Sequence, residues 1–176
     1  MKQSLSVVVP AYNEEGNIVK CIITLNNFFQ KSSYDYEIIV VDDGSKDKTG
    51  ELADQLAKKY KKLKVVHNSP NRGYGGSLKS GFAKAKNEFI CFIPGDNQFD
   101  IAEIEKLFDL QKQHNADIVS GIRVHDKDFS FYRKALRWTW NTLVRALFGY
   151  LATDIDCGFK LFRRSILDRL SLSSDG

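Results

Sequence analysis

The chain has 176 residues, of which 43% are hydrophobic and 27% are charged, and its formal net charge is +4. These values are ordinary for a globular domain, and the mild positive charge favours anionic partners without separating nucleotides, nucleic acids and acidic membranes. The three cysteines, Cys21, Cys91 and Cys157, lie far apart and show no CxxC spacing. This argues against a disulfide framework or a zinc site and fits a reducing compartment.

The sequence shows no segment of the roughly 20 apolar residues that a membrane span needs, and the apolar run after Lys2 is too short for a signal peptide. A helix-like segment is followed at once by the final residues, Leu-Ser-Leu-Ser-Ser-Asp-Gly. We therefore expect residues 1–176 to form one domain that is cut from a longer protein.

Short apolar runs and amphipathic segments alternate through residue 120. The predicted strands cover 5–9, 36–41, 64–66, 88–93 and 116–121. Apolar residues at helical spacing mark the predicted helices: Ile18, Ile22, Leu25 and Phe29; Leu52, Leu56 and Tyr60; Leu78 and Phe82; Ile104, Leu107 and Phe108. Asp100 and Glu103 resemble a capping box that opens the last helix. This alternation predicts an α/β fold with a Rossmann-like, mostly parallel sheet flanked by helices.

Polar segments follow the carboxyl ends of the predicted strands, where ligands bind in such sheets. One explanation is that Asn13, Asp47 and Asp100 only cap helices. Other polar residues in these segments are less easily explained as caps and mark a candidate ligand site: Asp42, Asp43, Arg72, Asp96 and Gln98.

Two of these segments suggest what the ligand is. In FIPGDNQFD (92–100), Asp96 and Gln98 offer the oxygen ligands that Mg²⁺ or Mn²⁺ prefers. In NRGYGGS (71–77), Arg72 and three glycines precede a helix whose N-terminus suits a phosphate. Both the Walker lysine spacing and the dinucleotide-binding GxGxxG are absent, so the pattern favours a metal-bridged nucleotide diphosphate.

Five motifs, VVVPAYNEE, EIIVVDDGSKDKT, NRGYGGS, GDNQ and DCGFKLFRR, occur in the order found in family 2 glycosyltransferases. From residue 5 to about 167 the chain resembles this family, and within it the synthases that transfer a sugar to polyprenyl or dolichyl phosphates. The resemblance implies a GT-A fold in a single catalytic domain. Its nucleotide-binding half would cover about 1–121 and its acceptor-side half about 122–176.

The resemblance also implies roles for donor-side residues. Those implied to bind the nucleotide sugar are Pro10, Tyr12, Glu14, Asp43, Arg72 and Gly73. Pro10, Tyr12 and Glu14 would border the nucleoside, Asp43 would contact the base, and Arg72 would lie near the diphosphate. Asp42 is expected to shape the turn.

The metal motif of the family usually reads Asp-x-Asp-x-Gln, whereas residues 94–98 read Pro-Gly-Asp-Asn-Gln. The implied ligands of Mg²⁺ or Mn²⁺ are therefore Asp96, which is also implied to be catalytic, and Gln98. Pro94 has no carboxylate to offer. We expect weaker metal affinity, or an ion that arrives only with the nucleotide, and loss of activity is the alternative.

Residues 123–164 are rich in aromatic and basic side chains, including Trp138 and Trp140. Between 131 and 150 the pattern is typical of an amphipathic helix on a membrane surface. A helix whose aromatics join the core fits equally well, and a nucleic-acid surface is conceivable. The family resemblance favours peripheral membrane contact and no nucleic-acid partner, because lipid-phosphate acceptors reside in membranes.

The resemblance places Arg123 and Arg133 near the acceptor phosphate, which a planar guanidinium binds bidentately. DIDCGFKLFRR matches the family motif Asp-x-x-Ser/Cys-Gly-Phe-Arg/Lys from Asp154, which would orient the acceptor or balance charge, and Asp156 is an additional carboxylate. Residues 158–161 also fit a short strand with a packing glycine.

Together these observations predict an inverting glycosyltransferase that moves a hexose from a donor of the GDP-mannose or UDP-glucose type to a polyprenyl or dolichyl phosphate. We expect it in the cytoplasm at the inner face of a membrane, and no oligomeric state is predicted. One alternative is a family 2 enzyme with a sugar-hydroxyl acceptor, which would need Asp154 or Asp156 as a base. Another is a noncatalytic nucleotide-sugar binding module. A dinucleotide-dependent oxidoreductase is disfavoured because VVVPAYNEE lacks the glycine fingerprint.

Overall fold

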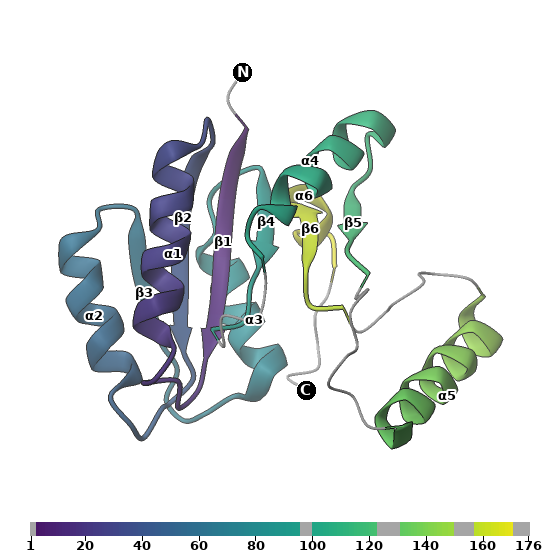
Figure 1. Cartoon of the computed structure of the whole chain (residues 1–176), viewed down its shortest axis with the longest axis horizontal. Helices are drawn as coiled ribbons and strands as arrows, with labels where there is room; N and C mark the ends of the chain where they lie inside the picture. The colour runs from purple at the N-terminus through teal and green to yellow at the C-terminus, as the bar shows by residue number, and fades with distance from the viewer. Residues whose placement is uncertain (1–2, 96–99, 123–130, 150–156, 171–176) are drawn as a thin grey trace.

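The computed structural model describes residues 3–95, 100–122, 131–149 and 157–170 (Figure 1). In these segments one six-stranded sheet has the order β3-β2-β1-β4-β6-β5. The strands are β1 (Ser4–Ala11), β2 (Asp35–Asp42), β3 (Leu63–His67), β4 (Phe89–Phe92), β5 (Ile118–Ser120) and β6 (Lys160–Arg163). β1 pairs in parallel with β2 and β4, and β2 pairs in parallel with β3, so the predicted α/β fold with a mostly parallel sheet is confirmed.

The order at the β5 edge differs from the prediction. The run 116–121 was expected to continue the parallel sheet, but β6 lies between β4 and β5 and pairs antiparallel with both. β5 therefore still runs in the direction of β4, and its carboxyl end faces the same sheet edge. The strand suggested at 158–161 is present as β6, shifted by two residues.

Helices cover both faces of the sheet (Figure 1). The helices of the described residues are α1 (Ile18–Lys31), α2 (Thr49–Lys59), α3 (Gly73–Lys84), α4 (Glu103–His114), α5 (Phe131–Phe148) and α6 (Arg164–Leu167), of which α5 lies apart from the sheet. Buried residues of α1, α2 and α4 share one apolar cluster with one side of the strands. Leu78 and Phe82 of α3 and Leu167 of α6 pack on a second cluster on the other side.

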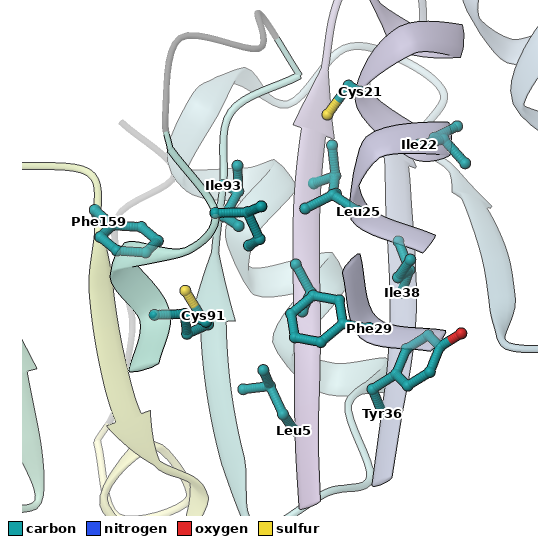
Figure 2. Packing of buried hydrophobic residues seen from close by; sticks show 14 of the residues in the cluster. Leu5, Cys21, Ile22, Leu25, Phe29, Tyr36, Ile38, Cys91, Ile93 and Phe159 are labelled. Carbon is teal, nitrogen blue, oxygen red and sulfur yellow. The ribbon is translucent and has the colours of Figure 1, made fainter. Parts of the chain in front are cut away.

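The two clusters follow from the alternation of side chains along the strands. In β1, Leu5, Val7 and Val9 belong to the α1 side, whereas Val8 belongs to the α3 side. Figure 2 shows the α1-side cluster, in which the ring of Phe29 stacks on that of Tyr36 with centroids 5.3 Å apart. Because both faces are buried, the strands read as nearly continuous apolar runs.

The predicted capping box at the start of α4 is wrong. The Asp100 carboxylate accepts a hydrogen bond from the backbone N–H of Ala102 at 3.0 Å, and the N–H of Glu103 donates to the backbone oxygen of Asp100 at 3.2 Å. A turn over residues 101–102 separates Asp100 from the first helical residue, Glu103. The side chain of Asp100 therefore stabilises this turn and does not cap the helix.

Candidate active site

A cavity of about 390 Å³ lies beyond the carboxyl ends of β1, β2 and β4, beside the N-terminus of α3. All but one of the residues predicted to bind the donor line it: Pro10, Tyr12, Glu14, Asp43 and Gly73. The sheet topology explains this grouping, because β1 lies between β2 and β4 and the three strands run in one direction.

Two loops that border the cavity are tied together by side chains. Asn13 accepts a hydrogen bond from the N–H of Lys46 at 2.8 Å, and Thr49 Oγ1 accepts one from the N–H of Glu14 at 2.7 Å. Asp47 accepts the N–H of Glu15 at 3.1 Å. Asn13 and Asp47 thus join the β1–α1 loop to the β2–α2 loop. Neither α1 nor α2 has a side-chain N-cap, so these two residues do not cap the helices.

Asp47 is ionised more readily than an ordinary aspartate. Burial acts to raise its pKa, but hydrogen bonds from the Thr49 hydroxyl and from the N–H groups of Thr49 and Glu15 outweigh burial and lower the pKa. The carboxylate is thereby kept in the acceptor form that the loop connection requires.

Adjacent aspartates at the end of β2 have different surroundings. Asp42 Oδ1 accepts the N–H of Ser45 at 3.1 Å, and Asp42 Oδ2 lies 2.9 Å from Nδ1 of His67. Asp42 therefore shapes the turn after β2. Asp43, in contrast, lines the cavity and is 3% exposed.

The Asp43 carboxylate is held through one oxygen. Its Oδ1 accepts a hydrogen bond from Asn68 Nδ2 at 2.7 Å and another from the backbone N–H of Arg72 at 3.0 Å. Asn71 Nδ2 donates to the backbone oxygen of Asp43 at 2.7 Å. The loop between β3 and α3 thus fixes both the main chain and the side chain of Asp43 at the cavity wall.

The predicted phosphate site at the start of α3 faces the cavity. Gly73, the first residue of α3, has a φ of 74°, which favours glycine, and its N–H donates to Asn71 Oδ1 at 3.0 Å. The positive end of the α3 dipole is therefore next to the cavity, as an anion site requires. Arg72 is exposed and its guanidinium lies 3.3 Å from Ser80 Oγ, outside the cavity lining.

Several residues that line the cavity were not predicted as site residues. They are Ala11, Asn71, Tyr74, Ser77, Pro94 and Gly95. Tyr74 and Ser77 are three positions apart at the start of α3, which places both on one helix face and could have indicated a shared role. Tyr74 is 52% exposed and Tyr12 is 45% exposed, so two aromatic rings at the cavity are accessible to a ligand.

All of the predicted catalytic and metal-binding side chains lie outside the described residues. These are Asp96, Gln98, Arg123 and Asp154, together with the side chain of Arg133. In the described segments no group of three or more His, Cys, Asp or Glu residues is arranged to hold a metal ion. Gly95, the last described residue before Asp96, lines the cavity, and its N–H donates to the backbone oxygen of Pro10 at 3.2 Å.

Helix α5 exposes apolar side chains. Leu136, Trp140, Leu143 and Leu147 are 49–67% exposed, and their spacing of four, three and four residues puts them on one face. Trp138 is 71% exposed. In Figure 1, α5 lies apart from the sheet on the β5–β6 side. Of the helices described here, α5 included, none is long and apolar enough to cross a bilayer.

Solved structures with the same fold are glycosyltransferases. The structure superposes with a TM-score of 0.70 on the Pyrobaculum calidifontis mannosyltransferase in complex with GDP-Man and Mn²⁺, at 21% identity, covering 99% of this chain and 48% of that one. For Mycobacterium tuberculosis glucosyl-3-phosphoglycerate synthase with Mn²⁺, uridine diphosphate and glucosyl-3-phosphoglycerate, the TM-score is 0.71 at 20% identity. This match covers 98% of this chain and 62% of that one. The chain therefore has the GT-A glycosyltransferase fold.

Sequence comparison defines the family. The model for glycosyl transferase family 2 matches residues 6–171, so this chain belongs to glycosyltransferase family 2. It is 35% identical to human dolichyl-phosphate beta-glucosyltransferase over 95% of this chain and 57% of the human protein. It is 31% identical to the protein of the same name from Saccharomyces cerevisiae, over 93% of this chain and 55% of the yeast protein. The chain thus spans little more than half the length of these relatives.

Proposed function

We propose that this chain carries the donor site of an inverting glucosyltransferase that transfers glucose from UDP-glucose to a dolichyl or other polyprenyl phosphate. The observation that carries the proposal is the cavity at the ends of β1, β2 and β4, where residues from separate motifs of a family 2 glycosyltransferase meet. The relatives named dolichyl-phosphate beta-glucosyltransferase support glucose as the sugar and a lipid phosphate as the acceptor.

In the proposed donor complex the nucleoside occupies this cavity. Asp43 accepts a hydrogen bond from the base, and Tyr12 and Tyr74 offer accessible ring faces. The diphosphate lies near the N-terminus of α3, where the helix dipole and Arg72 favour negative charge. Of these residues, Asp43 is held in place by the hydrogen bonds from Asn68 and Arg72 described above.

The chemistry requires no strong base. A phosphate acceptor has a second pKa of about 6 and is already an anion near neutral pH. One of its oxygens forms a bond to the anomeric carbon from the far face, while the bond from that carbon to the diphosphate oxygen breaks and UDP leaves. Arg123 and Arg133 would orient the acceptor phosphate, and Asp154 would balance charge or position the acceptor.

Asp96 and Gln98 have the oxygen donors that fit Mg²⁺ or Mn²⁺, and Gly95 brings the chain to the cavity wall immediately before them. When bound, a divalent ion offsets negative charge on the departing diphosphate. Pro94 leaves the motif one carboxylate short, so substrate oxygens and water would complete the coordination.

The membrane part of the proposal depends on α5. Its stripe of Leu136, Trp140, Leu143 and Leu147 is suited to the interface of a bilayer, where the acceptor lipid resides. We expect the purified protein to float with vesicles that contain anionic lipid. Replacing Leu143 and Leu147 by lysine should reduce flotation at least about fivefold, whereas the same change at exposed Leu110 of α4 should not. If the variant with lysine at Leu143 and Leu147 floats as well as the Leu110→Lys variant, membrane contact through this stripe is contradicted.

The activity is tested with radiolabelled UDP-glucose, GDP-mannose and UDP-N-acetylglucosamine, each with dolichyl phosphate vesicles and Mn²⁺, Mg²⁺ or EDTA. The expected result is metal-dependent transfer of glucose alone. Asp96→Ala should remove this transfer at saturating donor, whereas Arg133→Ala should chiefly weaken use of the lipid phosphate. Transfer of a different sugar, or unchanged turnover of Asp96→Ala with Mn²⁺, contradicts the corresponding assignment.

A further inference from the structure

We infer that Asn68 and Ser80 form a positioning pair that orients the Asp43 carboxylate and so makes the donor site selective for uridine over guanosine. The inference rests on the proposed function, because it assumes that Asp43 meets the base of a nucleotide. It concerns two residues that the site motifs do not include.

The pair forms a short hydrogen-bonded chain from α3 to the end of β2. Ser80 Oγ donates to Asn68 Oδ1 at 2.8 Å, and Asn68 Nδ2 donates to Asp43 Oδ1 at 2.7 Å. Asn68 is 7% exposed. A carboxylate can only accept, so the amide must present its nitrogen to Asp43, and the Ser80 hydroxyl holds the amide in this orientation.

These contacts leave the two carboxylate oxygens of Asp43 unequal. Oδ1 accepts from Asn68 Nδ2 and, at 3.0 Å, from the N–H of Arg72. Oδ2 accepts no hydrogen bond from the part of the chain that the structure describes. Asp43 lines the cavity, so Oδ2 is the oxygen available to a ligand.

A single available oxygen suits one base better than the other. The pairing edge of uracil has one donor, N3–H, between two carbonyl acceptors. The edge of guanine has two adjacent donors, N1–H and the N2 amino group, and a carboxylate matches both only when both of its oxygens are available. With Oδ1 occupied, the second guanine donor would stay unpaired beside the buried Asp43, which should weaken binding by roughly ten- to a hundredfold.

The isosteric variant Asn68→Asp tests the orientation directly. It places a carboxylate oxygen where the amide nitrogen lies 2.7 Å from Asp43 Oδ1, and two carboxylates this close must share a proton. UDP affinity, measured by calorimetry relative to wild type at the same pH, should fall by about tenfold or more at pH 8 and recover most of this loss at pH 5.5. An equal loss at both pH values would indicate a merely structural role and overturn the inference.

The ratio of the dissociation constants for GDP and UDP provides a second readout. Wild type should prefer UDP by about tenfold or more. Asn68→Ala and Ser80→Ala should reduce this preference, because Asn68→Ala removes one of the two hydrogen bonds to Oδ1 and Ser80→Ala releases the amide. Ser80→Thr should retain the preference. Asn27→Ala and Ser33→Ala, exposed positions remote from the cavity, are the matched controls. If Asn68→Asp does not fold, the Ser80 variants decide.

The outcomes separate this inference from the proposed function. A wild type that binds GDP as tightly as UDP, or variants that keep the wild-type ratio, overturns the inference even if glucose is transferred to the lipid. UDP selectivity that Asn68 and Ser80 control, without any transfer to a lipid phosphate, supports the inference and contradicts the proposed acceptor. A wild type that binds neither nucleotide contradicts both.

Discussion

Nδ1 of His67 lies 2.9 Å from Oδ2 of Asp42, and Nε2 of the same ring lies 3.3 Å from Oδ1 of Asp54. One imidazole therefore joins the end of β3 to the end of β2 and to α2. The hydrogen bond with Asp42 raises the pKa of His67, burial opposes this, and Asp54 adds to the increase. Asp42 precedes Asp43, which lines the cavity, so the charge of His67 acts close to the proposed donor site.

We predict that stability declines at mildly alkaline pH through His67. Because the pKa is raised in the folded state, protonated His67 stabilises the fold fully below the unfolded pKa of about 6.5, and this contribution is lost as the pH rises through the folded pKa. The ring is 46% exposed, so the loss should not exceed about 1 kcal/mol. Urea unfolding of wild type and His67→Gln from pH 5.5 to 9 measures it.

His67→Gln should lack the part of the pH dependence that is due to His67, whereas His114→Gln, at the exposed end of α4, should keep it. Parallel profiles for wild type and His67→Gln would show that the pKa of His67 is the same in the folded and unfolded states, which contradicts the prediction.

Gly81 of α3 is predicted to tolerate a methyl group poorly. A Cβ there would lie 2.3 Å from Cγ1 of Val8 and 3.2 Å from Cγ2 of Val41, both fully buried. Alanine favours a helix over glycine by about 1 kcal/mol, but steric overlap with the sheet should outweigh this gain. We expect Gly81→Ala to lower the free energy of unfolding by about 1–3 kcal/mol in urea titrations.

Gly16→Ala is the control, because a Cβ at Gly16 meets nothing within 4 Å. Adding Val8→Ala to Gly81→Ala removes the clashing methyl group, so the double variant should lose less stability than the sum of the single variants. Strict additivity would contradict the steric explanation.

The parallel part of the sheet could be predicted from the sequence, because strands buried on both faces produce apolar runs that few other structures share. The strand at β6 was predicted, but its place between β4 and β5 was not, since that place depends on pairings with segments about 40 and 70 residues earlier in the chain. The capping box at Asp100 failed for a local reason. The pattern of an acceptor followed three residues later by glutamate also fits a turn just before a helix, and only the backbone decides between them.

In the candidate site, the sequence predicted which motifs would meet, because the carboxyl ends of parallel strands share one edge. It could not predict which side chains of NRGYGGS point into the cavity. Arg72 contacts Ser80, whereas Tyr74 and Ser77 line the cavity. That division depends on where α3 begins. The helix begins at Gly73, which has a left-handed backbone conformation. Glycine permits this conformation but does not require it, so the start of the helix cannot be read from the glycine alone.

Glu37 is predicted to stabilise the opposite end of the sheet as an ionised carboxylate. It is 6% exposed, and it accepts hydrogen bonds at 2.7 Å from Ser6 Oγ and from the N–H of Lys86, with Lys64 Nζ at its other oxygen. Burial acts to raise the pKa of Glu37, but these hydrogen bonds together lower it. Its contribution is therefore present above the unfolded pKa of about 4.3 and lost as the pH falls through the folded pKa.

Glu37→Gln should accordingly be about 1–2 kcal/mol less stable than wild type at pH 7, with a smaller difference at acid pH. Urea unfolding at both pH values measures this. Asp35→Asn, which disrupts the exposed pair with Lys62, should change stability by less than about 0.5 kcal/mol. A deficit in Glu37→Gln that stays constant with pH would assign the loss to packing and not to ionisation.

Pro94 is predicted to limit metal-assisted donor binding, since it lines the cavity two residues before Asp96 and contributes no oxygen ligand from its side chain. Pro94→Asp would add a carboxylate at the first position of the motif. We expect the dissociation constant of UDP with Mn²⁺ to fall by about tenfold, which corresponds to about 1.4 kcal/mol, and to stay unchanged or rise in EDTA.

Pro94→Asn removes the ring without adding charge, so it separates relief of the proline constraint from metal binding. If Pro94→Asn tightens UDP binding as much as Pro94→Asp, the backbone and not the missing carboxylate limits affinity. If neither variant responds to Mn²⁺, the divalent ion does not reach the donor through residue 94.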